Sequence, residues 1–178
     1  MPIDEKLPFK SVHIAVLTVS DTRTYDDDKS GQLLVDRLIE DGHVQADRAI
    51  VTDDAHKIAT QFRSWIERDD VDVIISTGGT GLTGRDVTPE AMEQVCEKDI
   101  PGFGEYFRWI SAKKIGTSTI QSRAMAGLAK GTYLFALPGS SGACKDGWDE
   151  ILRFQLDFRH RPCNFVELMP RLREHEAT

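Results

Sequence analysis

Apolar residues occur along this chain in two patterns, short unbroken runs and longer stretches in which they recur three or four positions apart. The runs rich in β-branched residues, typical of buried strands, are 12–19 (VHIAVLTV), 48–52 (RAIVT), 71–76 (VDVIIS) and 132–137 (TYLFAL). After the first run, Leu34 and Leu38 fall on one helical face, with Ser30 as the expected N-cap and Gly42 as the stop. A second helix is expected to begin near Ala55.

This alternation of strands and helices is typical of βαβ units, whose parallel strands are covered by helices on both faces. Thr88, Pro89 and Glu90 predict a further helix start, with the Thr88 hydroxyl as cap, and Trp148 lies in another expected helix. Residues 115–128 are polar and carry no clear period. We therefore expect a doubly wound α/β fold with a mostly parallel sheet, formed by a single domain over residues 1–178 with flexible ends at 1–10 and 171–178.

The overall charge narrows the classes of partner. The chain of 178 residues has 22 basic and 29 acidic side chains, a formal net charge of −7. An acidic chain argues against a protein that wraps nucleic acid, and the longest apolar runs fall short of a membrane span. Three dispersed cysteines and an N-terminal segment without a basic and apolar leader predict a reducing, cytoplasmic setting. A local anion site is compatible with this charge.

A glycine-rich segment, TGGTGLTGRD at residues 77–86, directly follows the third expected strand. It contains G-x-G-x-x-G, but it lies after the wrong strand for a dinucleotide fold, and Arg85-Asp86 stands where a phosphate-binding P-loop has Lys-Ser/Thr. Glycines permit positive φ and close backbone approach, so their N–H groups can bind an anion. We expect a phosphate or pterin site rather than a plain turn, formed by Thr77, Gly78, Gly79, Thr80 and Gly81. A Cβ at Gly79 should weaken such binding more than it weakens the fold.

A second such segment follows the last expected strand, at Pro138, Gly139, Ser140 and Ser141. It precedes a helix, so its N–H groups and hydroxyls can also bind an anion. It is not G-x-S-x-G, which argues against a serine nucleophile. The carboxyl ends of parallel strands share one sheet edge, and the two segments are expected to meet there.

Two carboxylates are candidates for holding a cation beside bound phosphate. Asp86 lies just past the glycines, where a negative charge would repel phosphate unless it binds a cation such as Mg²⁺. The alternative for Asp86 is an interaction with a helix dipole. Asp53 and Asp54 end the second expected strand, and taken alone they are also compatible with solvated turn acids.

Three long motifs together resemble the molybdenum cofactor biosynthesis family that contains molybdopterin adenylyltransferase, with the closer match to its protein B branch. They are TGGTGLTGRDVTPEA, GFGEYFRWISAKKIGTSTIQSRAMAGLA and LPGSSGACKDGWDEIL. The similarity runs from IAVLTVSDTR to RPCNF, nearly the whole chain. It implies a doubly wound fold, binding of molybdopterin, and a homo-oligomer, trimeric or hexameric.

In the adenylyltransferases of this family, molybdopterin and MgATP give adenylylated molybdopterin and pyrophosphate. The family's essential acids match Asp86 and Asp53, so the resemblance implies that these two hold Mg²⁺ and act in catalysis. Differences at the loop tip, Leu82-Thr83-Gly84, leave ATP binding open. Three hypotheses follow: an adenylyltransferase, a silent molybdopterin carrier, and an oligomeric scaffold with the aromatic segment around Trp109 as its contact surface.

Overall fold

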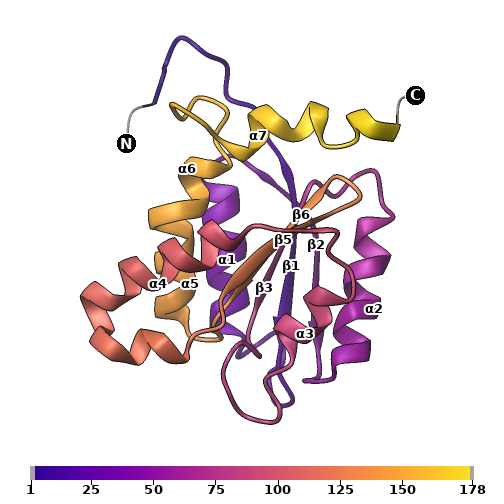
Figure 1. Cartoon of the computed structure of the whole chain (residues 1–178), viewed down its shortest axis with the longest axis vertical. Coiled ribbons are helices and arrows are strands. Elements are labelled where there is room, and N and C mark those ends of the chain that lie inside the picture. Colours follow the sequence, from indigo (N-terminus) through magenta and orange to yellow (C-terminus); the bar gives the residue numbers. More distant parts are fainter. Residues whose placement is uncertain (1–2, 177–178) are drawn as a thin grey trace.

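In a computed structural model, which describes residues 3–176, one six-stranded sheet stands between two layers of helices (Figure 1). The strands are β1 (His13–Val19), β2 (Val44–Val51), β3 (Val73–Thr77), β4 (Lys98–Asp99), β5 (Met125–Ala129) and β6 (Thr132–Leu137). The α-helices are α1 (Lys29–Glu40), α2 (Ala55–Ile66), α3 (Thr88–Glu93), α4 (Pro101–Ile115), α5 (Ser141–Gly147), α6 (Arg153–Gln155) and α7 (Phe165–Leu168). The 3₁₀-helices are η1 (Gly116–Gln121), η3 (Met169–Arg171) and η4 (Glu174–Glu176), and η2 (Trp148–Leu152) is a π-helical turn.

The strand order β2-β1-β3-β6-β5-β4 confirms the predicted α/β fold. Strands β2, β1, β3 and β6 are parallel, whereas β5 runs antiparallel to both β6 and β4. The chain passes from β1 to β2 on one side and then returns to place β3 on the other side of β1. This reversal makes a topological switch point between β1 and β3, where open α/β sheets bind ligands beyond the carboxyl ends of the strands.

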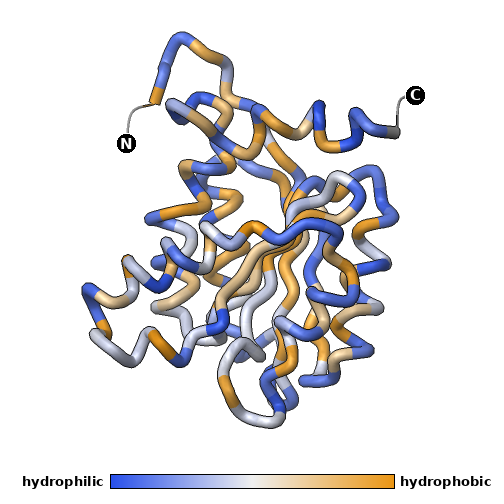
Figure 2. Tube along the Cα trace, in the orientation of Figure 1, coloured by the Kyte–Doolittle hydropathy of each residue, from blue (hydrophilic) through white to orange (hydrophobic). Residues whose placement is uncertain are grey.

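Two hydrophobic clusters cover the two faces of the sheet. One contains Leu34 and Leu38 of α1 with Phe103 and Phe107 of α4, and the other contains Phe62 of α2. Figure 2 shows the corresponding pattern, with hydrophobic residues along the central strands and mixed character on the outer helices. Burial on both faces explains why β3 and β6 are buried along their whole length and read as continuous apolar runs.

Local details differ from the expectations at two helix starts and in the segment without a clear period. Helix α1 is capped by Asp28, whose carboxylate accepts from the Gly31 N–H, rather than by Ser30. Thr88 is the first residue of α3 instead of its cap, because its hydroxyl donates to the Gly78 carbonyl oxygen at 2.8 Å. The part of the chain without a period proved to contain η1 and β5.

The ends of the chain are described only in part. Of the ends expected to be flexible, residues 1–2 and 177–178 lie outside the described residues. Ile3 forms a β-bridge with His160, and the Asp4 N–H donates to the Arg159 carbonyl oxygen at 2.9 Å. No helix in the range 3–176 is long and apolar enough to cross a membrane.

Candidate functional site

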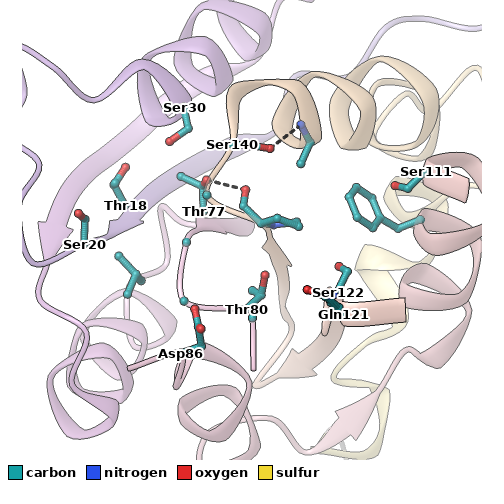
Figure 3. Close-up of a pocket in the computed structure, with 18 of the residues that line it drawn as sticks. Thr18, Ser20, Ser30, Thr77, Thr80, Asp86, Ser111, Gln121, Ser122 and Ser140 are labelled. Atoms are coloured by element: carbon teal, nitrogen blue, oxygen red, sulfur yellow. Dashed lines mark hydrogen bonds between the residues drawn. The ribbon is translucent and has the colours of Figure 1, made fainter. Parts of the chain in front are cut away.

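A cavity of about 530 Å³ opens at the switch point, beyond the carboxyl ends of β1, β3 and β6. Thr18 and Val19 line it from β1, Thr77 from β3, and the segment after β6 completes this side. Figure 3 shows hydroxyl groups facing the opening from two sides, with Thr18, Ser20 and Ser30 opposite Ser111 and Ser122.

The structure brings most of the predicted site residues to this cavity. Those that line it are Thr77, Gly78, Gly79, Thr80, Gly81, Asp86, Pro138, Gly139 and Ser140. Asp53 and Ser141 lie outside the lining. Asp53 is nevertheless close, because its Oδ1 is 3.4 Å from the point where a Cβ on Gly79 would stand.

The glycine loop, residues 78–87, is packed tightly at its start. Gly78 has φ +103°, and a Cβ there would meet the Val19 carbonyl oxygen at 2.2 Å. Gly79 has φ +65°, and a Cβ there would meet the Thr88 hydroxyl at 2.4 Å. A side chain at Gly79 would therefore also weaken the fold, since the added Cβ would displace the Thr88 hydroxyl from its position against the loop.

The second loop is tied to the first. The Thr77 hydroxyl donates to the Pro138 carbonyl oxygen at 3.1 Å, and a Cβ on Gly139 would come within 3.2 Å of the Gly78 Cα. Ser140 caps α5, where its Oγ accepts from the Ala143 N–H at 3.2 Å. The hydroxyls of Thr77 and Ser140 thus hold the shape of the site.

Asp86 stands at the far end of the glycine loop. Its Oδ2 accepts from the Thr83 hydroxyl at 2.7 Å and from the Thr83 N–H at 2.9 Å. These hydrogen bonds hold the pKa of Asp86 below its ordinary value, although burial acts in the opposite direction. Asp86 is therefore an oriented, ionised carboxylate at the rim of the cavity.

Asp53 has the opposite environment. Burial raises the pKa of Asp53 above its ordinary value, and the negative charges of Asp21 and Asp86 raise it further. Arg85 opposes this effect, but its guanidinium is engaged by Asp21, to which it donates from Nε at 3.0 Å. The Asp21 carboxylate also accepts from the Asp53 N–H at 3.1 Å. Asp21, which sequence reasoning missed, thus joins the ends of β1 and β2 to the glycine loop.

This arrangement of carboxylates fits a cation shared with a ligand better than a cation held by protein alone. Among residues 3–176, no three His, Cys, Asp or Glu side chains are grouped so that they could hold a metal ion. The negative charge of Asp86 contributes to the raised pKa of Asp53, and a divalent cation near both carboxylates would offset this effect. Mg²⁺ is commonly bound in this way, by one or two carboxylates together with substrate phosphates.

Sequence reasoning missed the wall opposite the two loops. Phe107, Ser111 and Ile115 of α4 line the cavity, followed by Thr119 and Gln121 of η1. Ser111 lies one helical turn from Phe107, so a polar position on the buried face of an apolar helix was the available signal. Arg23, in the loop after β1, also lines the cavity and supplies a positive charge there. It is a single cation in an acidic stretch, a pattern that does not by itself indicate a site.

Comparisons with known proteins agree with this geometry. A family model described as "Probable molybdopterin binding domain" matches residues 15–157. Molybdenum cofactor biosynthesis protein B of Escherichia coli (strain K12) is 50% identical over 157 residues, covering 88% of this chain and 92% of that protein.

Solved structures give the same result. A crystal structure of a molybdenum cofactor biosynthesis protein B superposes with a TM-score of 0.80 at 43% identity, over 83% of this chain and 92% of the other. The tungsten cofactor synthesizing protein MoaB from Pyrococcus furiosus gives 0.72 at 35% identity, over 80% and 91%. These matches confirm the resemblance predicted from the three motifs. The chain therefore belongs to the molybdopterin-binding domain family of molybdenum cofactor biosynthesis.

Proposed function

We propose that this protein binds molybdopterin in the cavity at the switch point and transfers an adenylyl group to it from MgATP. The observation that carries the proposal is the position of Asp86 and Asp53 beside the two glycine-containing loops. A backbone anion site next to two mutually repelling carboxylates suits a phosphate-rich ligand that arrives with a cation.

The reaction needs little from the protein in covalent terms. A phosphate oxygen of molybdopterin attacks the α-phosphorus of ATP, a new P–O bond forms, and the bond to the β-phosphate oxygen breaks to release pyrophosphate. The attacking oxygen is already ionised, so the reaction needs no protein nucleophile and no histidine base. Catalysis of this kind depends on positioning and on neutralising charge.

Each part of the site has a defined task in this proposal. The N–H groups of Gly79 and Thr80 bind phosphate, since the Gly78 N–H already donates to the Leu137 carbonyl oxygen at 3.0 Å. Arg23, which lines the cavity, offsets negative charge there. Asp53 and Asp86 would hold Mg²⁺, which when bound offsets the negative charge of the reacting phosphates. The hydroxyls of Ser111 and Ser122 on the opposite wall are available to the polar edge of the pterin.

The test is release of pyrophosphate by the purified protein with molybdopterin and MgATP. The proposal predicts one pyrophosphate per adenylylated molybdopterin, and no release when either substrate or Mg²⁺ is omitted. Calorimetric titration with molybdopterin distinguishes the alternative. A silent carrier would bind molybdopterin and release no pyrophosphate.

We infer in addition that the protein is a homo-oligomer, a trimer or a hexamer. Large apolar side chains are exposed along α4 and η1: Trp109 is 56% exposed and Ile120 is 77% exposed. The Tyr106 and Trp109 rings contact each other with centroids 5.4 Å apart. Aromatic groups of this kind are enriched in protein interfaces. Because the same segment lines the cavity, assembly would leave one face of α4 for the ligand and another for the partner subunit.

A further inference from the structure

Arg123 connects the segment after η1 to the glycine loop. It follows η1 directly after Ser122, a lining residue, and it precedes β5. Its side chain is 31% exposed and extends away from its own segment to the glycine loop. Through this guanidinium, the segment after η1 is hydrogen-bonded to the loop that carries Asp86.

The contacts of Arg123 span the loop. Its Nε donates to the Gly81 carbonyl oxygen at 2.7 Å, and its Nη2 donates to the Asp86 carbonyl oxygen at 2.7 Å. Its Nη1 pairs with the Glu90 carboxylate at 2.5 Å. Its backbone N–H donates to the Thr80 carbonyl oxygen at 3.0 Å. Four acceptors at 80, 81, 86 and 90 are therefore held by one residue.

The loop has few other supports between these points. It contains no regular secondary structure from Gly79 to Val87, and its tip residue Leu82 is 68% exposed. The Thr83–Asp86 hydrogen bonds close the tip on itself, and the tip contacts the sheet edge through the solvent-exposed Arg85–Asp21 ion pair. Only a planar guanidinium can bridge the carbonyl oxygens of Gly81 and Asp86 together, because a lysine ammonium is a point donor.

We propose that Arg123 is a positioning residue. It fixes the distance between Gly81 and Asp86 in the glycine loop and thereby the position of the Asp86 carboxylate. The expected effect of Arg123 on catalysis rests on the proposed function. Its effect on the loop does not, because it follows from the hydrogen bonds alone. Arg123 touches loop carbonyls and Glu90, and its effect on the ligand is exerted through Gly81 and Asp86.

The test compares Arg123→Lys with Arg63→Lys. Arg63 is the control, since its guanidinium also donates to a backbone carbonyl oxygen, that of Gln94 at 3.3 Å, and it lies outside both the glycine loop and the cavity lining. Hydrogen–deuterium exchange is measured for the amides of residues 80–87, together with kcat and KM for MgATP. Glu90→Gln is the second control, because it removes the ion pair and leaves both carbonyl contacts.

In Arg123→Lys, we expect the amides of residues 80–87 to exchange about tenfold faster or more, because charge-assisted hydrogen bonds to the loop are lost. It should lower kcat by about 100-fold, the effect of misplacing a reacting group by about an ångström. Arg63→Lys and Glu90→Gln should leave both readings near those of the parent protein. KM for MgATP should change less than kcat. The faster exchange should be confined to the glycine loop, because only a general loosening of the fold would alter exchange throughout the chain.

Unchanged exchange in Arg123→Lys would overturn the proposal, as would a variant whose loop loosens while kcat is preserved. If the parent protein releases no pyrophosphate, the proposed function fails instead. The exchange result, with molybdopterin affinity in place of kcat, then still decides whether Arg123 positions the loop.

Discussion

At the scale of single residues, the folded protein disfavours the ionised form of Asp53. Its pKa is raised by burial and by the negative charges of Asp21 and Asp86. The folded state therefore binds a proton more readily than the unfolded chain, and Asp53 lowers stability as pH rises above its ordinary pKa of about 3.8. The charge of Asp53 therefore does not stabilise the folded protein at neutral pH.

We therefore expect Asp53→Asn to raise the Tm of the protein at neutral pH in the absence of Mg²⁺, because the substitution removes the disfavoured charge. The gain should disappear below about pH 4, where the carboxyl is protonated in both states. Thermal unfolding followed by circular dichroism measures it. Asp54→Asn is the control: Asp54 caps α2 through its contact with the Lys57 N–H at 3.0 Å, and asparagine caps equally well.

Gly79 is predicted to be a structural glycine as well as a ligand contact. Gly79→Ala places a Cβ at φ +65° and 2.4 Å from the Thr88 hydroxyl, so the free energy of unfolding should fall by about 1–2 kcal/mol or more. Gly84→Ala is the matched control, because among the described residues nothing lies within 4 Å of its Cβ position. Urea unfolding measures both variants. Equal stability of the two would contradict the packing described for the loop.

At the scale of elements, the start of α1 depends on a buried carboxylate. Asp28 accepts from the Thr18 hydroxyl at 2.7 Å and pairs with Arg48 at 3.0 Å. Burial alone would raise the pKa of Asp28, but these hydrogen bonds and the Arg48 charge lower it below its ordinary value. Asp28 thus links β1, α1 and β2 at the edge of the cavity.

Asp28→Asn should lower the free energy of unfolding by about 3 kcal/mol at neutral pH, since it leaves the largely buried Arg48 guanidinium without its counter-charge. The folded pKa is depressed, so this stability is complete above the unfolded pKa near 4 and is lost as pH falls through the folded value. The difference between parent and variant in urea unfolding should therefore shrink in acid. Asp36→Asn, an exposed change on the same helix, should have little effect.

Sequence patterns predicted the parallel elements because burial on both faces produces unbroken apolar runs, as in β6. The β5–β6 hairpin was missed because its two-residue turn is Lys130-Gly131. Both residues have positive φ, +47° and +84°, as a type I′ turn requires, but lysine is an unusual residue there. Tertiary contact overrode the expected cap at Thr88, whose hydroxyl serves Gly78 instead.

The site was predictable where a chemical motif coincides with a strand end, as at Gly78, Asp86 and Gly139. It was not predictable where the contribution depends on how distant elements pack. Ser111 reaches the cavity through the placement of α4, and Asp21 acquires its importance from Arg85, which is 64 positions away in the chain.

At the scale of the whole molecule, the exposed aromatic face of α4 is expected to be covered by a second copy. Trp109→Asp should convert an assembly of about three or six times 19.9 kDa into a smaller species, because a buried carboxylate at an apolar contact is strongly unfavourable. Light scattering after gel filtration measures this. Ile39→Asp, on an exposed position of α1, is the control, and a parent protein of 19.9 kDa in solution would contradict the proposed assembly.

We propose that adenylyl transfer depends on the Asp53 and Asp86 carboxylates beside the glycine loop, which would hold Mg²⁺. The most direct measurement is pyrophosphate release with molybdopterin and MgATP by the parent, Asp86→Asn and Asp54→Asn proteins. Asparagine preserves the shape of Asp86 and can still accept from Thr83, so we expect molybdopterin binding to persist while turnover falls by about 10²–10³-fold. Asp54→Asn should retain the parent rate. Full activity in Asp86→Asn would contradict the account.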